Sequence, residues 1–174
     1  MNILTLPGLG NSEPQHWQSH WENSAENCQR VNQADWQNPN CAQWLAVLEE
    51  RVKAAGPETI LVAHSLGCLL VAHWAAQTQL RIKAAMLVAV PNPASPVFPT
   101  QITGFTPVPM QRLPFDSIVV ASSNDPYAAI TYAQTCAAAW GSTLLNIGAA
   151  GHINAASDLG AWVEGQRLLQ QLHA

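Results

Sequence analysis

Residues 59–75 read TILVAHSLGCLLVAHWA, and this stretch indicates a buried strand, a tight turn and a helix. Thr59 to Ala63 is a short apolar run, and an apolar helical pattern extends from Leu66 to Gln77. Ser65 stands at the turn, with small residues, Ala63 and Gly67, two positions before and after it. This is the context of a G-x-S-x-G elbow, in which a strained turn projects a serine hydroxyl, although Ala63 replaces the first glycine.

The rest of the chain alternates short apolar runs with helical stretches. We expect strands over residues 3–6, 30–32, 59–63, 84–90, 117–122 and 143–147, and helices over residues 13–23, 41–55, 66–77, 127–140 and 159–172. Ser12 is expected to cap the first helix. The strands are continuous apolar runs, as is typical of strands covered on both faces. The pattern therefore predicts the α/β class, with a mostly parallel sheet of about six strands flanked by helices.

Length and composition favour a single domain over residues 1–174. Apolar residues make up 48% of the chain and charged residues 10%, which argues against disorder. The net charge of −4 is mild and the basic residues do not cluster, so we expect neither nucleic-acid nor membrane binding. The start MNILTLPGLG lacks the features of a signal peptide, so a cytoplasmic location is expected. The four cysteines form no CxxC pair, and no metal site is expected.

Two further polar residues directly follow predicted strands. Asp125 comes after the strand over residues 117–122, and His152 lies in a Gly-flanked loop after the last strand. Alone, Asp125 before Pro126 would be favoured as a helix cap and His152 as an ordinary surface residue. In an open α/β sheet, however, ligands bind outside the carboxyl ends of the strands. The order Ser65, Asp125, His152 is that of the α/β-hydrolase triad, which predicts a nucleophile, an acid and a base.

The loop Pro7-Gly8-Leu9-Gly10 after the first strand is the candidate partner of this elbow. We expect the Leu66 N–H, at the start of a helix, to face an oxyanion on the substrate. The Leu9 N–H is expected to be the second donor, and Gly8 is expected to let the backbone pass close to the substrate. The alternative is that residues 7–10 form only a tight turn.

Four stretches resemble the RBBP9/YdeN family of small serine hydrolases, a compact branch of the α/β-hydrolases. They are PGLGNSEPQHWQSHWE (7–22), VAHSLGCLLVAHWA (62–75), LPFDSIVVASSNDPY (113–127) and WGSTLLNIGAAGHINAASDLG (140–160). The resemblance implies the triad of Ser65, Asp125 and His152 and a fold without a large lid domain. It also implies hydrolytic activity of the esterase or peptidase kind.

Several other residues are candidates for substrate binding or packing. Residues 91–114 contain seven of the twelve prolines, which is typical of a functional loop or of a stiffened surface connection. Its apolar side chains are expected to form an acyl pocket, namely Val97, Phe98, Ile102, Phe105 and Met110. His16 either lines the mouth of the pocket or packs in an aromatic face. His64 is expected to be structural, because in a strand its side chain points away from that of Ser65.

These patterns together predict a serine hydrolase that cleaves a small carboxylic ester or related acyl bond. The reaction would pass through an acyl-enzyme on Ser65, with His152 as general base and Asp125 orienting it, and without a cofactor. The alternative is an α/β-hydrolase-fold protein-binding module with little or no turnover. A nucleotide-binding protein is disfavoured, because GLGNSE lacks the third glycine of a dinucleotide motif. The sequence indicates neither the leaving group, an alcohol or an amine, nor the oligomeric state.

Overall fold

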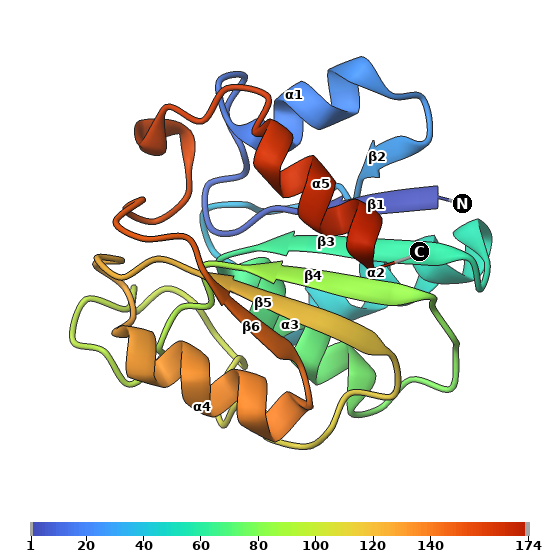
Figure 1. Cartoon of the computed structure of the whole chain (residues 1–174). Helices are drawn as coiled ribbons and strands as arrows, with labels where there is room; N and C mark the ends of the chain where they lie inside the picture. The colour runs from blue at the N-terminus through green and yellow to red at the C-terminus, as the bar shows by residue number, and fades with distance from the viewer. Residues whose placement is uncertain (1, 173–174) are drawn as a thin grey trace.

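The computed structural model describes residues 2–172, and its centre is a parallel β-sheet (Figure 1). All neighbouring strands pair in parallel, and the order across the sheet is β2-β1-β3-β4-β5-β6. The strands are β1 (Asn2–Leu6), β2 (Cys28–Arg30), β3 (Thr59–His64), β4 (Ala84–Val88), β5 (Asp116–Ala121) and β6 (Thr143–Asn146). Strands β3 and β4 are buried throughout, as their largely apolar sequences predict.

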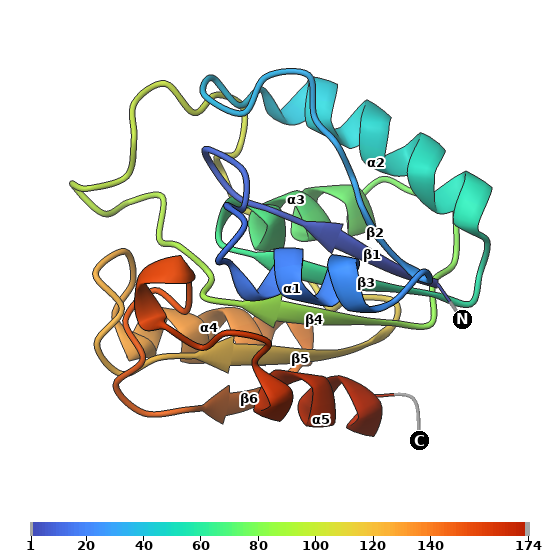
Figure 2. The ribbon, with the colours of Figure 1, turned by 90° about the horizontal axis from the view of Figure 1, so that it is seen from above.

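Helices cover both faces of the sheet, which makes three layers (Figure 2). They are α1 (Trp17–Ser24), α2 (Cys41–Ala55), α3 (Leu66–Ala75), α4 (Ile130–Trp140) and α5 (Val163–Gln171). Helices α2, α3 and α4 enclose one core with the sheet, and α1 and α5 enclose the other. The predicted α/β class, with a parallel six-stranded sheet and no large lid domain, is confirmed.

The strand order identifies one crevice, at the carboxyl ends of β1 and β3, as the expected site of ligand binding. From β1 the chain runs outward to the edge strand β2, and α2 then returns it across β1 to β3 on the other side. The loops that leave the carboxyl ends of β1 and β3 therefore diverge side by side. In open α/β sheets such a switch point is where ligands bind. The two loops here are the predicted oxyanion loop and the serine turn.

Three predicted helix starts were wrong. Helix α1 begins at Trp17 rather than residue 13, and its cap is His16, not Ser12. The Ser12 hydroxyl instead donates to the Gln18 side chain at 2.7 Å, so it ties the preceding loop to the helix. Helix α4 begins at Ile130, and α5 begins at Val163 after Trp162, which has a positive φ of 39°. The general error was to extend helical periodicity backwards into irregular turns.

The proline-rich segment connects β4 to β5 without an intervening helix in the described chain. It crosses over the start of α2, where the Cys41 N–H donates to the Thr103 carbonyl at 3.0 Å. This contact anchors the middle of the loop beside the carboxyl edge of the sheet. No helix within residues 2–172 is long and apolar enough to cross a membrane.

Candidate active site

Ser65 stands in a strained turn between β3 and α3. Its φ of 53° and ψ of −122° lie in a region that residues with a side chain rarely adopt. The turn is possible because α3 packs directly against β1: a Cβ on Gly67 would lie 2.2 Å from the Leu6 carbonyl oxygen. Gly67 therefore permits the close approach that raises the serine above the sheet edge. Ala63, the departure from the usual motif, is fully buried without displacing the strand.

We expect Gly67→Ala to lower the free energy of unfolding by about 3 kcal/mol or more, because the new methyl group meets backbone rather than a movable side chain. Helix propensity alone predicts the opposite sign. Gly56→Ala is the control for backbone strain without overlap: its Cβ has nothing within 4 Å, but its φ of 83° and ψ of 179° are nearly restricted to glycine, so we expect a loss of about 1–3 kcal/mol. Urea unfolding of both variants measures the difference. Equal losses in the two would contradict the close-packing explanation.

The three predicted triad residues form a hydrogen-bonded series in which His152 lies between Ser65 and Asp125. The Ser65 Oγ is 2.8 Å from the His152 Nε2, and the His152 Nδ1 is 2.9 Å from both carboxylate oxygens of Asp125. The side chains of His152 and Asp125 are 9% and 4% exposed, so water competes little for this interaction. Asp125 also accepts the Tyr127 N–H at 2.9 Å, which fixes its carboxylate. The alternative role of Asp125 as a helix cap is excluded, because Ala129 precedes α4.

A second set of hydrogen bonds ties the acid loop to the base loop. The Asn124 side chain accepts the Gly151 N–H at 2.7 Å and the Ser122 hydroxyl at 2.8 Å. The Ser122 hydroxyl in turn accepts the Ala150 N–H at 2.9 Å. These bonds hold the segment before His152 against the segment before Asp125. Sequence reasoning missed both residues, although short polar side chains beside a predicted acid are a usable signal.

The loop after β1 lies against the serine turn, as the oxyanion prediction requires. A Cβ on Gly8 would lie 2.9 Å from the Ser65 Cβ and 3.2 Å from the Leu66 nitrogen, so only glycine fits without a shift. Leu9 and Leu66 both line the pocket. Within residues 2–172, neither of their N–H groups donates to the protein. Both therefore remain free for a substrate oxygen.

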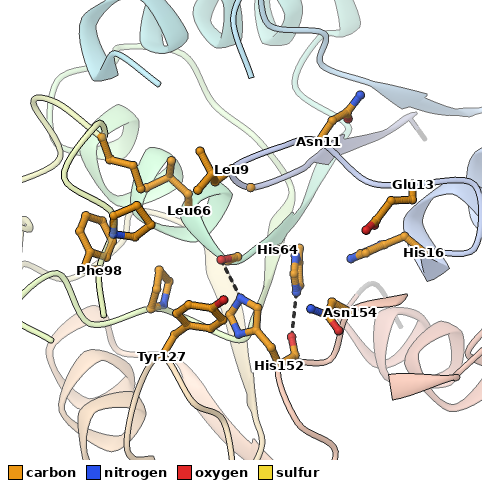
Figure 3. Close-up of a pocket in the computed structure, with 15 residues that line it drawn as sticks. Leu9, Asn11, Glu13, His16, His64, Leu66, Phe98, Tyr127, His152 and Asn154 are labelled. Atoms are coloured by element: carbon orange, nitrogen blue, oxygen red, sulfur yellow. Dashed lines mark hydrogen bonds between the residues drawn. The ribbon is translucent and has the colours of Figure 1, made fainter. Parts of the chain in front are cut away.

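The pocket above Ser65 has a volume of about 170 Å³, which suits a small substrate (Figure 3). Phe98 and Ile102 of the proline-rich loop line it, together with Pro91 and Pro99. The prediction of an acyl pocket in this loop was wrong for its other members. Val97 and Met110 are exposed, and Phe105 is buried in the core beside α2 and α3. The sequence could not show which of these side chains line the pocket, because side chains in an irregular loop do not point in a repeating pattern.

Two histidines, His16 and His64, line the pocket in addition to His152. His64 donates from its Nε2 to the His152 carbonyl oxygen at 2.9 Å, so it contacts the backbone of the predicted base. His64 was expected to be structural, and this bond to the backbone is a structural contact; the side chain also lines the pocket. His16 lines the same pocket and is 2% exposed. Of the two roles left open for it, His16 takes both, because its ring also packs against Trp17.

The fold and the crevice define a hydrolase of the α/β-hydrolase superfamily, and comparison with known proteins identifies the family. The serine hydrolase family model matches residues 3–171, and the chain belongs to this family. A protein of Pectobacterium atrosepticum described as a YdeN-like hydrolase is 33% identical, with a TM-score of 0.86 over 98% of this chain and 89% of that one. The predicted resemblance is thus confirmed, and the protein is a serine hydrolase.

More distant structures share the fold. The ydeN gene product of Bacillus subtilis is 18% identical, with a TM-score of 0.77 over 98% of this chain and 97% of that one. A thermophilic esterase from Thermogutta terrifontis is 14% identical, with a TM-score of 0.70 over 100% and 91% of the two chains. A search of curated proteins found no match to the sequence.

Proposed function

We propose that this serine hydrolase cleaves small carboxylic esters through an acyl-enzyme on Ser65. The observation that carries the proposal is the continuous hydrogen-bonded series from Ser65 through His152 to Asp125 at the floor of a small pocket. Residues 1–174 would act as one domain, with no metal or organic cofactor in the reaction. The alternative, a binding module without turnover, gives no reason for a strained serine beside a buried histidine–carboxylate pair.

The reaction would begin with attack of the Ser65 hydroxyl on the ester carbonyl carbon. His152 takes the hydroxyl proton as the carbon–oxygen bond forms, and Asp125 stabilises the resulting imidazolium. The free N–H groups of Leu9 and Leu66 stabilise the oxyanion, each contributing about 10²- to 10³-fold in rate. His152 then gives its proton to the leaving alcohol. Water attacks the acyl-enzyme by the same route and releases the acid and the serine.

The pocket supports a small acyl group rather than a long lipid chain. Its volume of about 170 Å³ lies below the range of roughly 300–1,000 Å³ that is typical of pockets for drug-sized ligands. The apolar side chains of Phe98 and Ile102 would contact the hydrocarbon part of the substrate. Gly8 would lie beside the scissile carbonyl, where its lack of a side chain leaves room for the substrate.

The acyl-enzyme is tested by competition between water and methanol. Two esters of the same acid, with phenol and p-nitrophenol as leaving groups, are hydrolysed in buffer that contains methanol. Because both form the same acyl-enzyme, we expect the ratio of acid to methyl ester to be identical for the two. A ratio that changes with the leaving group would indicate direct attack by water and would contradict the mechanism.

A further inference from the structure

The pocket has two chemically different ends, on either side of the His152 ring (Figure 3). Leu9, Leu66, Phe98 and Tyr127 lie on one side. The other side is polar and is formed by Asn11, Glu13, His16, His64 and Asn154. The mechanism proposed above uses none of the polar side chains at this second end. They are therefore available to recognise a part of the substrate away from the scissile bond.

His16 presents an unpaired hydrogen-bond donor at the polar end. Its Nδ1 accepts the Gln18 N–H at 3.2 Å, so the neutral ring carries its proton on Nε2. Burial is the largest cause that lowers the pKa of His16 to about 4, which keeps the ring neutral near pH 7. The Nε2 is buried and has no partner among the residues that the structure describes. In Figure 3 the His16 ring, just before the start of α1, points towards His64.

His64 presents the complementary unpaired acceptor. Because its Nε2 donates to the His152 carbonyl oxygen, the lone pair of the neutral ring is on Nδ1. In the described part of the chain, no hydrogen bond reaches this Nδ1. Burial is the largest cause that holds the pKa of His64 well below its usual value, so this ring also stays neutral. The two rings pack edge to face with their centroids 4.7 Å apart.

A hydroxyl group matches this pair, since it accepts one hydrogen bond and donates another. A carboxylate would face the His64 lone pair, and an ammonium group would leave the His16 N–H without an acceptor. We propose that the His16 Nε2–H and the His64 Nδ1 together bind a hydroxyl group of the substrate. The substrates would then be small hydroxylated esters, with a hydrocarbon part at Phe98 and the hydroxyl at the histidine pair. This inference rests on the ester hydrolysis proposed above.

The test compares esters in which a hydroxyl group is replaced by a methyl group of similar size. One pair is the ethylene glycol monoester and the propyl ester of the same acid, and the other is ethyl 3-hydroxypropanoate and ethyl butanoate. We expect wild-type kcat/KM to favour the hydroxyl member by about tenfold in one pair. We expect the preference in the glycol pair, whose hydroxyl group is on the leaving alcohol. His152 protonates this alcohol, and the centroid of the His64 ring lies 5.0 Å from that of the His152 ring.

Two variants of His16 separate its two hydrogen bonds. His16→Asn keeps an acceptor where Nδ1 lies, and Asn is a favoured cap, but it removes the Nε2 donor. His16→Gln keeps a donor near Nε2 and loses the cap. We expect Asn to reduce the hydroxyl preference to about threefold or less, and Gln to retain most of it despite lower stability. If His16 only capped α1, Asn would keep the hydroxyl preference better than Gln, because Asn keeps the cap and Gln loses it.

The outcomes distinguish this inference from the hydrolase function itself. A preference in either pair that Asn removes and Gln keeps supports the hydroxyl site, and the pair concerned shows which end of the substrate lies there. Absence of any hydroxyl preference in wild type, or a preference that Asn leaves intact, overturns it. Wild-type reaction of Ser65 with a fluorophosphonate is measured in parallel. If that reaction fails, the hydrolase proposal is wrong; if only the preference fails, the hydroxyl site alone is wrong.

Discussion

Replacement of Ser65 by alanine is expected to lower kcat for ester hydrolysis by about 10⁴-fold or more. The variant keeps His152, Asp125 and the free N–H groups of the oxyanion site, but it has no oxygen to form the acyl-enzyme. Loss of a serine nucleophile elsewhere costs about 10⁶-fold, and the remaining groups supply only the residual rate. The release of p-nitrophenol from a short ester measures the effect. Turnover within tenfold of wild type would contradict the assignment of Ser65.

Ser65→Gly is the matched control for stability. It removes the same hydroxyl, but glycine accepts the φ of 53° and ψ of −122° without strain. We expect Ser65→Gly to be inactive and yet about 1 kcal/mol more stable than Ser65→Ala, as measured by thermal unfolding. If both variants are inactive although Ser65→Gly is more stable than Ser65→Ala, loss of the fold is excluded as the cause of inactivity.

Asp125→Asn is expected to lower kcat by about 10³- to 10⁴-fold while leaving the fold intact. An amide can turn an N–H towards the His152 Nδ1, which favours the tautomer that cannot accept the Ser65 proton on Nε2. The carboxylate charge that stabilises the imidazolium is also lost. The contact is short, at 2.9 Å from both oxygens, and nearly dry, so solvent cannot substitute for it.

Asp158→Asn is the control for this substitution, because it removes the same charge from an exposed residue outside the pocket. Its positive φ of 51° also suits asparagine. We expect this control to hydrolyse the test ester at the wild-type rate. A loss at Asp125 no larger than that at Asp158 would show that net charge, and not the contact with His152, explains the result.

The sheet and the three triad positions could be predicted because each depends on a local pattern. Ser65 follows an apolar run and precedes a helical one, and Asp125 and His152 each follow a strand. Parallel strands bring their carboxyl ends to one edge, so topology alone brings these residues near one another. The structure adds their mutual distances, which no spacing along the chain determines. Their roles in the reaction remain predictions.

The polar end of the pocket could not be predicted, because it depends on how α1 begins. His16 reaches the pocket since the helix starts at Trp17, four residues after the predicted start. That His64 also lines the pocket could not be predicted, because the strand ends at His64 and the chain turns sharply at Ser65. Asn124 was missed because its partner, Gly151, lies in a loop whose path the sequence does not define.

The most direct test of the central claim is the reaction of the folded protein with a fluorophosphonate, followed by intact mass and peptide mapping. The probe reports whether Ser65 is an activated nucleophile, whatever the natural substrate is. We expect one adduct per chain, on Ser65, and its loss in His152→Ala. Absence of an adduct in the folded protein, or equal labelling in His152→Ala, would contradict the account.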